Sequence, residues 1–269
     1  MNLINNTIVI TGGGSGIGRG LAEAFHALGN QVIIGGRRTS VLDEVTAANP
    51  GMKSLELDAA RPESIISFAN QIIDENPAVN VLINNAGITH PENLRDDEFT
   101  VAPSEEIITT NLLGPIRLTA AFLPHLLTRP NAAILNVTSG LAFVPFAWAP
   151  TYCATKAALH SYTQSLRYQV QKTGMRVIEI IPPYVQTELG GAYQKTDPRA
   201  MPLADYIAET MSILKASPEA NEICVEAVKP LRTAEQAGGY DALFQKFNDS
   251  LADVAAKRFA QAGRNASSN

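Results

Sequence analysis

Cysteine is scarce in this sequence: the chain has two, Cys153 and Cys224, far apart and without a Cys-x-x-Cys pair. Neither a disulfide framework nor a cysteine-based zinc site is therefore indicated. No apolar run reaches the roughly 18 to 20 residues that a membrane helix needs, since Pro124, His125 and Pro182-Pro183 interrupt the most apolar regions. The first ten residues also lack the basic cluster of a secretory signal. We therefore expect a cytoplasmic protein without a membrane span.

Basic charge is also in short supply. The chain carries 21 basic and 26 acidic residues, a net charge of −5, and no basic run is longer than Arg37-Arg38. Proteins that bind nucleic acid or anionic lipid by charge need a concentrated basic surface, so neither partner is expected. The four histidines, His26, His90, His125 and His160, lack the spacing of metal ligands, so no metal site is predicted.

Short β-rich segments alternate with helical patterns through most of the chain. Hydrophobic residues make up 45% of the sequence and charged residues 17%, which is enough for a full core. Strands are predicted at residues 7–10, 31–35, 53–57, 80–83, 132–138 and 175–181, and long helices at 103–128 and 151–172. This alternation is typical of an α/β fold in which a doubly wound parallel sheet is buried between helices.

The chain is predicted to form a single domain, residues 1–269, with its core over about 5–190. No linker, repeat or low-complexity tract divides the first 185 residues. A polar, proline-containing segment follows from about residue 189 and is placed to close over a substrate. The patterns at 222–233 and 240–259 are more helical than strand-like, so we expect a helical C-terminal extension to about residue 260 and place no seventh strand. Residues 261–269 are predicted to be a frayed tail.

Glycines cluster in the segment Thr11-Gly-Gly-Gly-Ser-Gly-Ile-Gly18, between a strand-like run and a helical pattern. Backbone N–H groups at a helix N-terminus bind a pyrophosphate only if no side chain blocks the approach. Gly12 is expected to make the tight turn, Gly16 the close approach and Gly18 the helix-on-strand packing. Ser15 and Ile17 belong to the same predicted contact. The segment predicts a dinucleotide site, and the alternative is a glycine-rich turn that binds nothing.

Tyr152 and Lys156 lie four residues apart in a predicted helix and therefore share one face. A phenol has a reference pKa near 10, so proton exchange at neutral pH needs a nearby cation that stabilises the phenolate, and Lys156 can supply that charge. Ser139 follows an apolar strand, which places its hydroxyl at the sheet edge where ligands bind. A serine donor and a tyrosine acid aimed at one oxygen polarise a carbonyl for hydride attack. The alternatives are a surface Tyr-Lys pair and a serine that only ends a strand.

Taken together, these motifs resemble the short-chain dehydrogenase/reductase family over roughly residues 5–190: Thr11-Gly-x-x-x-Gly-x-Gly18, Asn84-Asn85-Ala86-Gly87, Asn111, Ser139 and Tyr152-x-x-x-Lys156. The resemblance implies a seven-stranded Rossmann-type sheet, an NAD(P)(H) cofactor and a catalytic tetrad of Asn111, Ser139, Tyr152 and Lys156. Tyr152 is implied to be the general acid or base, and Ser139 to orient the substrate oxygen. Lys156 is implied to lower the pKa of Tyr152 and to hold the nicotinamide ribose.

Asn111 is implied by the same resemblance to kink the long helix and to hold a water that links Lys156 to solvent. The alternative is a polar residue in a helix interior, where asparagine has weak propensity. Asn85, Ala86 and Gly87 are implied to line the cofactor, whereas Asn84 is assigned a structural role. Asp58 resembles the family's adenine-binding aspartate, although an aspartate after a strand is commonly a turn former.

The segment Pro182-Pro183-Tyr184-Val185-Gln186-Thr187 resembles the family's Pro-Gly-x-Val-x-Thr segment. Val185 and Thr187 are implied to hold the carboxamide, with Pro182 in the same contact. Pro183 replaces the usual glycine and stiffens the loop, and with the unusual C-terminal part it resembles the DltE-like branch of the family. Phe143, Phe146, Trp148 and Tyr184 are expected to flank the nicotinamide in a partly apolar pocket, with an ordinary hydrophobic loop as the alternative.

Charge at the end of the second strand predicts which dinucleotide is used. NAD enzymes place an acid there for the ribose hydroxyls, but this chain has Gly35-Gly36-Arg37-Arg38. Arg37 is expected to hydrogen-bond the 2′-phosphate of NADP, with Ser15 as a further donor. The alternative is that both arginines face solvent.

The sequence therefore predicts an NADP(H)-dependent oxidoreductase that moves a hydride between nicotinamide and a small-molecule carbonyl or secondary alcohol. Two alternatives stand beside it: a sugar-nucleotide epimerase or dehydratase, and a non-catalytic dinucleotide sensor. The intact Ser139, Tyr152 and Lys156 argue against the sensor. The family resemblance suggests a homodimer or homotetramer built on the long helices.

Overall fold

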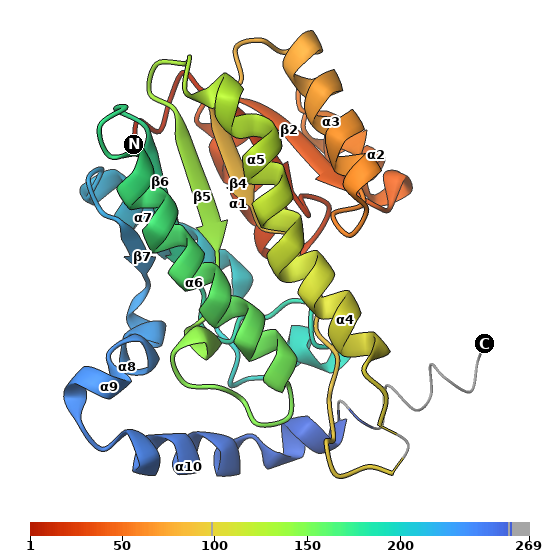
Figure 1. Ribbon diagram of the computed structural model, residues 1–269, viewed down its shortest axis with the longest axis vertical. Helices are drawn as coiled ribbons and strands as arrows, with labels where there is room; N and C mark the ends of the chain where they lie inside the picture. The colour runs from red at the N-terminus through yellow and green to blue at the C-terminus, as the bar shows by residue number, and fades with distance from the viewer. Residues whose placement is uncertain (98, 258, 260–269) are drawn as a thin grey trace.

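A single parallel sheet forms the centre of the computed structural model, which describes residues 1–97, 99–257 and 259 (Figure 1). Its strands within those residues are β1 (Thr7–Thr11), β2 (Gln31–Gly36), β3 (Lys53–Glu56), β4 (Val81–Asn84), β5 (Ala133–Val137), β6 (Arg176–Ile181) and β7 (Glu222–Cys224). Their order is β3-β2-β1-β4-β5-β6-β7. The chain reverses its direction of winding between β1 and β4, and open sheets of this kind bind ligands at the carboxyl ends beside that point.

Helices cover both faces of the sheet because each parallel crossover must return over one face. One layer contains α1 (Gly16–Ala27), α2 (Thr39–Ala48) and α7 (Leu203–Ala216). The other contains α3 (Pro62–Glu75), α5 (Gly114–Leu126) and α6 (Pro150–Val170). The largest buried side chains divide in the same way, with Phe25 and Tyr206 in the first layer and Phe68 and Phe122 in the second. The six predicted strands and the α/β class are confirmed.

The C-terminal part contains a strand that the sequence pattern did not indicate. Residues 222–233 read as helical, but Glu222–Cys224 form β7, whose Glu222 pairs with Glu179 of β6. Tertiary pairing overrides the local preference of this three-residue segment. The helical extension is otherwise present as α8 (Lys229–Arg232), α9 (Ala234–Ala237) and α10 (Tyr240–Ser250), which lies across the carboxyl ends of the strands (Figure 1). The predicted frayed tail, 261–269, lies outside the described residues.

The predicted long helix at 103–128 is interrupted. It consists of α4 (Ala102–Ile108), a π-helical turn at Thr109–Leu113 and α5. Single π-helical turns are uncommon and are frequent at functional sites. Across the described residues, no helix combines the length and apolar character that a bilayer crossing requires.

Candidate active site

A cavity of about 1130 Å³ opens at the carboxyl ends of the strands. Its volume exceeds the range of roughly 300 to 1,000 Å³ typical of a small-molecule pocket, which suits a dinucleotide together with a second ligand. The predicted site residues that line it are Gly12, Ser15, Gly16, Ile17, Arg37, Asp58, Asn85, Ala86, Gly87, Ser139, Tyr152, Lys156, Pro182, Val185 and Thr187. Gly18 and Asn111 lie behind this lining.

The glycine loop joins β1 to the N-terminus of α1 and contributes Gly12, Gly14, Ser15, Gly16 and Ile17 to the cavity lining. Gly12 has a φ of +68°, a conformation that glycine adopts without strain. A Cβ atom on Gly18 would lie 2.3 Å from the carbonyl oxygen of Gly12, so only glycine fits where the helix packs against the turn. The loop therefore leaves the space that a pyrophosphate needs at a helix N-terminus.

Thr11 organises this loop although sequence reasoning gave it no role. Its hydroxyl oxygen accepts hydrogen bonds from the backbone N–H groups of Asn85 at 3.0 Å and Ala86 at 3.1 Å. The Asn85 side chain in turn donates to the carbonyl oxygen of Thr11 at 2.9 Å. These bonds fix the end of β4 against the glycine loop. Asn84 has the structural role predicted for it, since its side chain donates to Asn136 at 2.9 Å inside the core.

Ser139, Tyr152 and Lys156 meet on one side of the cavity. Ser139 follows β5, and its hydroxyl oxygen accepts a hydrogen bond from the N–H of Leu141 at 3.1 Å. Tyr152 and Lys156 are one turn apart on α6, both buried, and the Lys156 Nζ lies 5.6 Å from the centre of the Tyr152 ring. Because Tyr152 and Lys156 are buried, the alternative of a surface Tyr-Lys pair is wrong. The bond from Leu141 is also the one that a strand-ending serine makes, so the role of Ser139 toward a substrate stays a prediction.

Lys156 carries its amine into the protein interior. Its Nζ donates to the carbonyl oxygen of Val137 at 2.9 Å. Val137 is the last residue of β5, and Thr138 and Ser139 follow it directly. Burial lowers the pKa of Lys156 from 10.5 to about 8, because desolvation disfavours the charged amine. A cation in this low-polarity setting acts strongly on its neighbours, since little water screens it.

Asn111 lies in the π-helical turn and is fully buried. Its Oδ1 accepts from the N–H of Ile88 at 2.8 Å, and its Nδ2 donates to the carbonyl oxygen of Ile88 at 2.8 Å. The Asn111 amide therefore pairs with the backbone of the loop after β4 as a neighbouring strand would. A Cβ on Gly87 would lie 3.3 Å from Asn111 Oδ1 and 3.7 Å from Lys156 Nζ, so this loop passes close to both side chains.

Both arginines after β2 line the cavity. Arg38 contacts Ser15, with 3.4 Å between its Nη2 and the serine Oγ. Arg37 lies 4.0 Å from Glu106 of α4 and is more than half exposed. Gly36 leaves this edge without an acidic side chain, and a Cβ there would meet only Leu42 at 3.5 Å.

Asp58 has the turn-forming role considered for it, and its contact with adenine stays a prediction. Its Oδ1 accepts from the N–H of Ala60 at 3.0 Å, as in a turn-forming aspartate, and the residue also lines the cavity.

The segment after β6 packs under a short segment, residues 189–202, which we call the lid. Gln194, in a 3₁₀ turn at Ala192–Thr196, donates to the carbonyl oxygen of Val185 at 2.8 Å and contacts the Thr187 hydroxyl at 3.1 Å. The lid thereby holds the two residues expected to contact the carboxamide. Nothing in the spacing of Gln194 indicated this contact.

The aromatic residues expected near the nicotinamide separate into two groups. Phe146 and Tyr184 line the cavity. Phe143 instead packs edge-on against His160, with ring centres 4.8 Å apart, and Trp148 packs against Phe259 at 5.7 Å. The expectation is therefore wrong for Phe143 and Trp148, because their rings face neighbouring helices. Cys153 is buried, and its Sγ accepts a hydrogen bond from the N–H of Phe146 at 3.3 Å.

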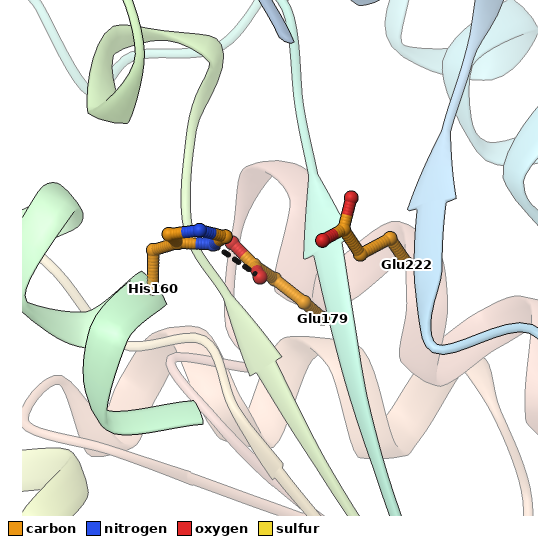
Figure 2. Close-up of side chains that lie close together, drawn as sticks. All are labelled: His160, Glu179 and Glu222. Atoms are coloured by element: carbon orange, nitrogen blue, oxygen red, sulfur yellow. Dashed lines mark hydrogen bonds and ion pairs between the residues drawn. The ribbon is translucent and has the colours of Figure 1, made fainter. Parts of the chain in front are cut away.

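His160, Glu179 and Glu222 converge from α6, β6 and β7 (Figure 2), with one possible ligand atom of each within 4.8 Å of the others. Sequence spacing did not indicate this cluster. Its carboxylates already accept from protein donors: Glu179 from the Thr138 hydroxyl at 2.6 Å and from His160 Nδ1 at 2.7 Å, and Glu222 from Arg232 at 2.7 and 3.0 Å. Because the Arg232 guanidinium repels any neighbouring cation, we interpret the cluster as a partly buried hydrogen-bond network that includes the Glu222–Arg232 ion pair.

Comparison with known proteins agrees with this arrangement. The family model described as short chain dehydrogenase matches residues 6–198. A solved short-chain dehydrogenase from Burkholderia cenocepacia J2315 in complex with NADP is 24% identical, with a TM-score of 0.77, over 91% of this chain and 98% of that one. One from Burkholderia phymatum in complex with NAD is 20% identical, with a TM-score of 0.75, over 88% and 95%. These two likenesses show the fold.

Among curated proteins, the uncharacterized oxidoreductase DltE of Bacillus subtilis (strain 168) is similar over 251 residues, 92% of this chain and 98% of that protein. Such identity, 39% over nearly the whole of both chains, and the match to the family model place the chain in the short-chain dehydrogenase/reductase family of oxidoreductases, in its DltE-like branch.

Proposed function

We propose that this protein is an NADP(H)-dependent oxidoreductase that transfers a hydride between nicotinamide and a carbonyl or secondary alcohol carbon. The observation that carries the proposal is the meeting of Ser139, Tyr152 and Lys156 in the cavity that also contains the glycine loop. Gly12, Gly14 and Gly16, which line the cavity at the start of α1, leave space for a dinucleotide pyrophosphate. When bound, the cofactor supplies or accepts the hydride.

The residues of the chain supply the remaining chemistry. Ser139 donates a hydrogen bond to the substrate oxygen, and Tyr152 gives that oxygen a proton during reduction and removes it during oxidation. The Lys156 ammonium stabilises the phenolate form of Tyr152 and holds the nicotinamide ribose. Asn111 positions the loop after β4, through Ile88, beside Lys156.

Preference for NADP(H) rests on the end of β2. Gly36 offers no carboxylate to bind ribose hydroxyls or to repel a phosphate, whereas Arg37 and Arg38 line that edge. Hydrogen bonds between arginine and a phosphate are charge-assisted and specific in geometry. One solved relative holds NADP and another NAD, so we infer the cofactor preference of this chain from these side chains. A cytoplasmic location and a homodimer or homotetramer stay predictions of the sequence.

The experiment combines cofactor titration with a carbonyl screen. Purified protein is titrated with NADPH and NADH, and aldehydes, ketones, quinones and steroids are then tested with each. We expect tighter binding of NADPH and turnover that Tyr152→Phe abolishes while NADPH affinity stays nearly unchanged, because only one hydroxyl is lost. Tighter binding of NADH contradicts the cofactor assignment, and near-normal turnover by Tyr152→Phe contradicts the mechanism.

A further inference from the structure

The C-terminal segment 240–257, α10 and the residues after it, forms one side of the cavity; we call it the C-terminal wall. Phe247, Leu251 and Val254 recur at helical spacing, so they share one face, and all three line the cavity. Phe247 and Leu251 also pack against the apolar cluster that contains Phe146 and Tyr152. The wall therefore presents an apolar face at the Tyr152 end of the cavity.

Asn248 attaches the C-terminal wall to the loop after Ser139. Its Oδ1 accepts from the N–H of Ala147 at 2.7 Å, and its Nδ2 donates to the carbonyl oxygen of Pro145 at 3.1 Å. An asparagine side chain that satisfies two backbone groups of a loop behaves like a strand partner for it. This side of the wall is therefore fixed to the segment that carries Phe146.

Arg199 attaches the same wall to the lid. Its two terminal nitrogens lie 2.7 and 3.0 Å from the oxygens of Asp253, and it also donates to the carbonyl oxygen of Ser250 at 3.2 Å. Paired bonds of this kind fix geometry as well as charge. Hydrogen bonds from Arg199 lower the pKa of Asp253 to about 2, so the pair is ionised throughout the neutral range. The wall is held from both sides of the cavity.

The surfaces that face the C-terminal wall are apolar as well. They belong to the loop after β5, the lid and α8, and their cavity-lining side chains include Leu141, Phe146, Leu189, Met201 and Leu231. A ligand that enters here exchanges water contacts for hydrocarbon contacts, which favours an apolar group by about 25 cal/mol per Å² buried.

Charged side chains at this end of the cavity are already engaged. Arg199 is paired with Asp253, and Glu188 lies 3.0 Å from Lys195. Apart from Lys156, the described arginine and lysine side chains at this end are therefore not free to bind a carboxylate or phosphate on a substrate. An unpaired anion buried against this surface is costly.

We propose that the C-terminal wall selects uncharged aldehydes or ketones whose carbonyl carries an aliphatic chain or ring, with Phe247, Leu251 and Val254 as the specificity-determining residues. The apolar part lies between this wall and the lid while the carbonyl oxygen faces Ser139 and Tyr152. The inference deepens the proposed function and rests on it for the reaction at the carbonyl, whereas the apolar binding region is tested separately by binding.

The experiment measures binding of unbranched methyl ketones, from butanone to decanone, to the protein saturated with NADP⁺, by isothermal titration calorimetry. We expect Kd to fall about fourfold for each added methylene until the region is filled, which corresponds to about 0.8 kcal/mol per buried methylene. Leu251→Ala should weaken decanone binding about tenfold and leave butanone nearly unchanged. Leu243→Ala is the matched control, because Leu243 lies on the same helix but outside the cavity lining.

The same ketones are assayed for NADPH oxidation, so that the two proposals can fail separately. Chain-length-dependent binding that Leu251→Ala reduces supports the apolar region even if no ketone turns over, and that absence of turnover counts against the proposed function alone. A Kd independent of chain length, equal losses in Leu251→Ala and Leu243→Ala, or tighter binding of an oxo acid than of the ketone of equal length overturns the inference.

Discussion

Replacing Lys156 by methionine removes one charge and keeps an unbranched side chain in the same space. The Lys156 Nζ lies 5.6 Å from the centre of the Tyr152 ring. At an effective dielectric constant of about 20, two unit charges at this separation interact by about 3 kcal/mol. If the ammonium stabilises the Tyr152 phenolate, this energy corresponds to roughly a hundredfold in rate. We therefore expect Lys156→Met to lower kcat for alcohol oxidation with NADP⁺ by about that factor.

The pH dependence of this loss follows from the lowered pKa of Lys156. Burial brings that pKa to about 8, so the free protein loses the stabilising charge as the pH rises above 8. The ratio of wild-type to Lys156→Met rates should therefore be largest below pH 8 and decline above it. The apparent pKa of the wild-type profile belongs to the Tyr152–Lys156 pair, because the two groups titrate together.

Stability gives an independent check of the same burial. The unfolded chain keeps the Lys156 proton up to its ordinary pKa of 10.5, whereas the folded protein releases it near 8. Because the unfolded state then binds more protons, the free energy of unfolding should rise between these two pH values. Lys156→Met should not show this rise in urea unfolding.

The control is Tyr152→Phe, which should lose turnover without losing cofactor affinity, whereas Lys156→Met should weaken both. A rate loss below about threefold at pH 7, with normal NADPH binding, would refute the electrostatic role assigned to Lys156.

Three further outcomes test other parts of the molecule. Arg37→Ala and Arg38→Ala should each weaken NADPH binding by roughly ten- to a hundredfold and spare NADH, since a hydrogen bond to a charged group contributes about 1.5 to 3 kcal/mol; equal losses for both cofactors in fluorescence titration would argue against phosphate recognition. His160→Ala should destabilise the protein by about 3 kcal/mol in urea unfolding, because it removes a partner of the fully buried Glu179; a change below 1 kcal/mol would mean that water replaces the imidazole. Trp148 emission should change little on saturation with NADPH, because its ring packs against a neighbouring helix, and strong quenching would place it nearer the cofactor than the structure does.

Local chemistry accounts for the parts of the fold that the sequence predicted. The glycine loop could be predicted from the sequence because contacts with a few neighbouring atoms require glycine at positions 12 and 18. Five of the six longer strands could be predicted because continuous apolar runs mark strands buried on both faces; the exception is β3, which has a polar sequence and exposed ends. The spacing of Tyr152 and Lys156 defines one helix face wherever the helix lies.

Features that depend on distant partners could not be predicted. Arg199 and Asp253 are 54 residues apart, and no local pattern relates them. The strand β7 could not be predicted because it is only three residues long and contains one buried apolar residue between Glu222 and Cys224. The partner that stabilises Glu222 is Arg232, which lies on a later helix. The role of Thr11 could not be predicted because a threonine at a strand end is common, and its hydrogen bonds are made with the distant loop after β4.

The π-helical turn at Thr109–Leu113 makes the site sensitive to the number of residues in this turn as well as to its side chains. A π-helix closes its hydrogen bonds one residue later than an α-helix, so the turn contains one residue more than regular winding would need. Deleting a residue such as Leu112 would restore continuous α-helical bonding. The flanking segments α4 and α5 would keep nearly the same relative orientation, because the residues of the π turn wind the chain by about as much as one fewer α-helical residue. The bulge in which Asn111 lies would be lost, and the loop beside Lys156 would lose the anchor that Asn111 provides through Ile88.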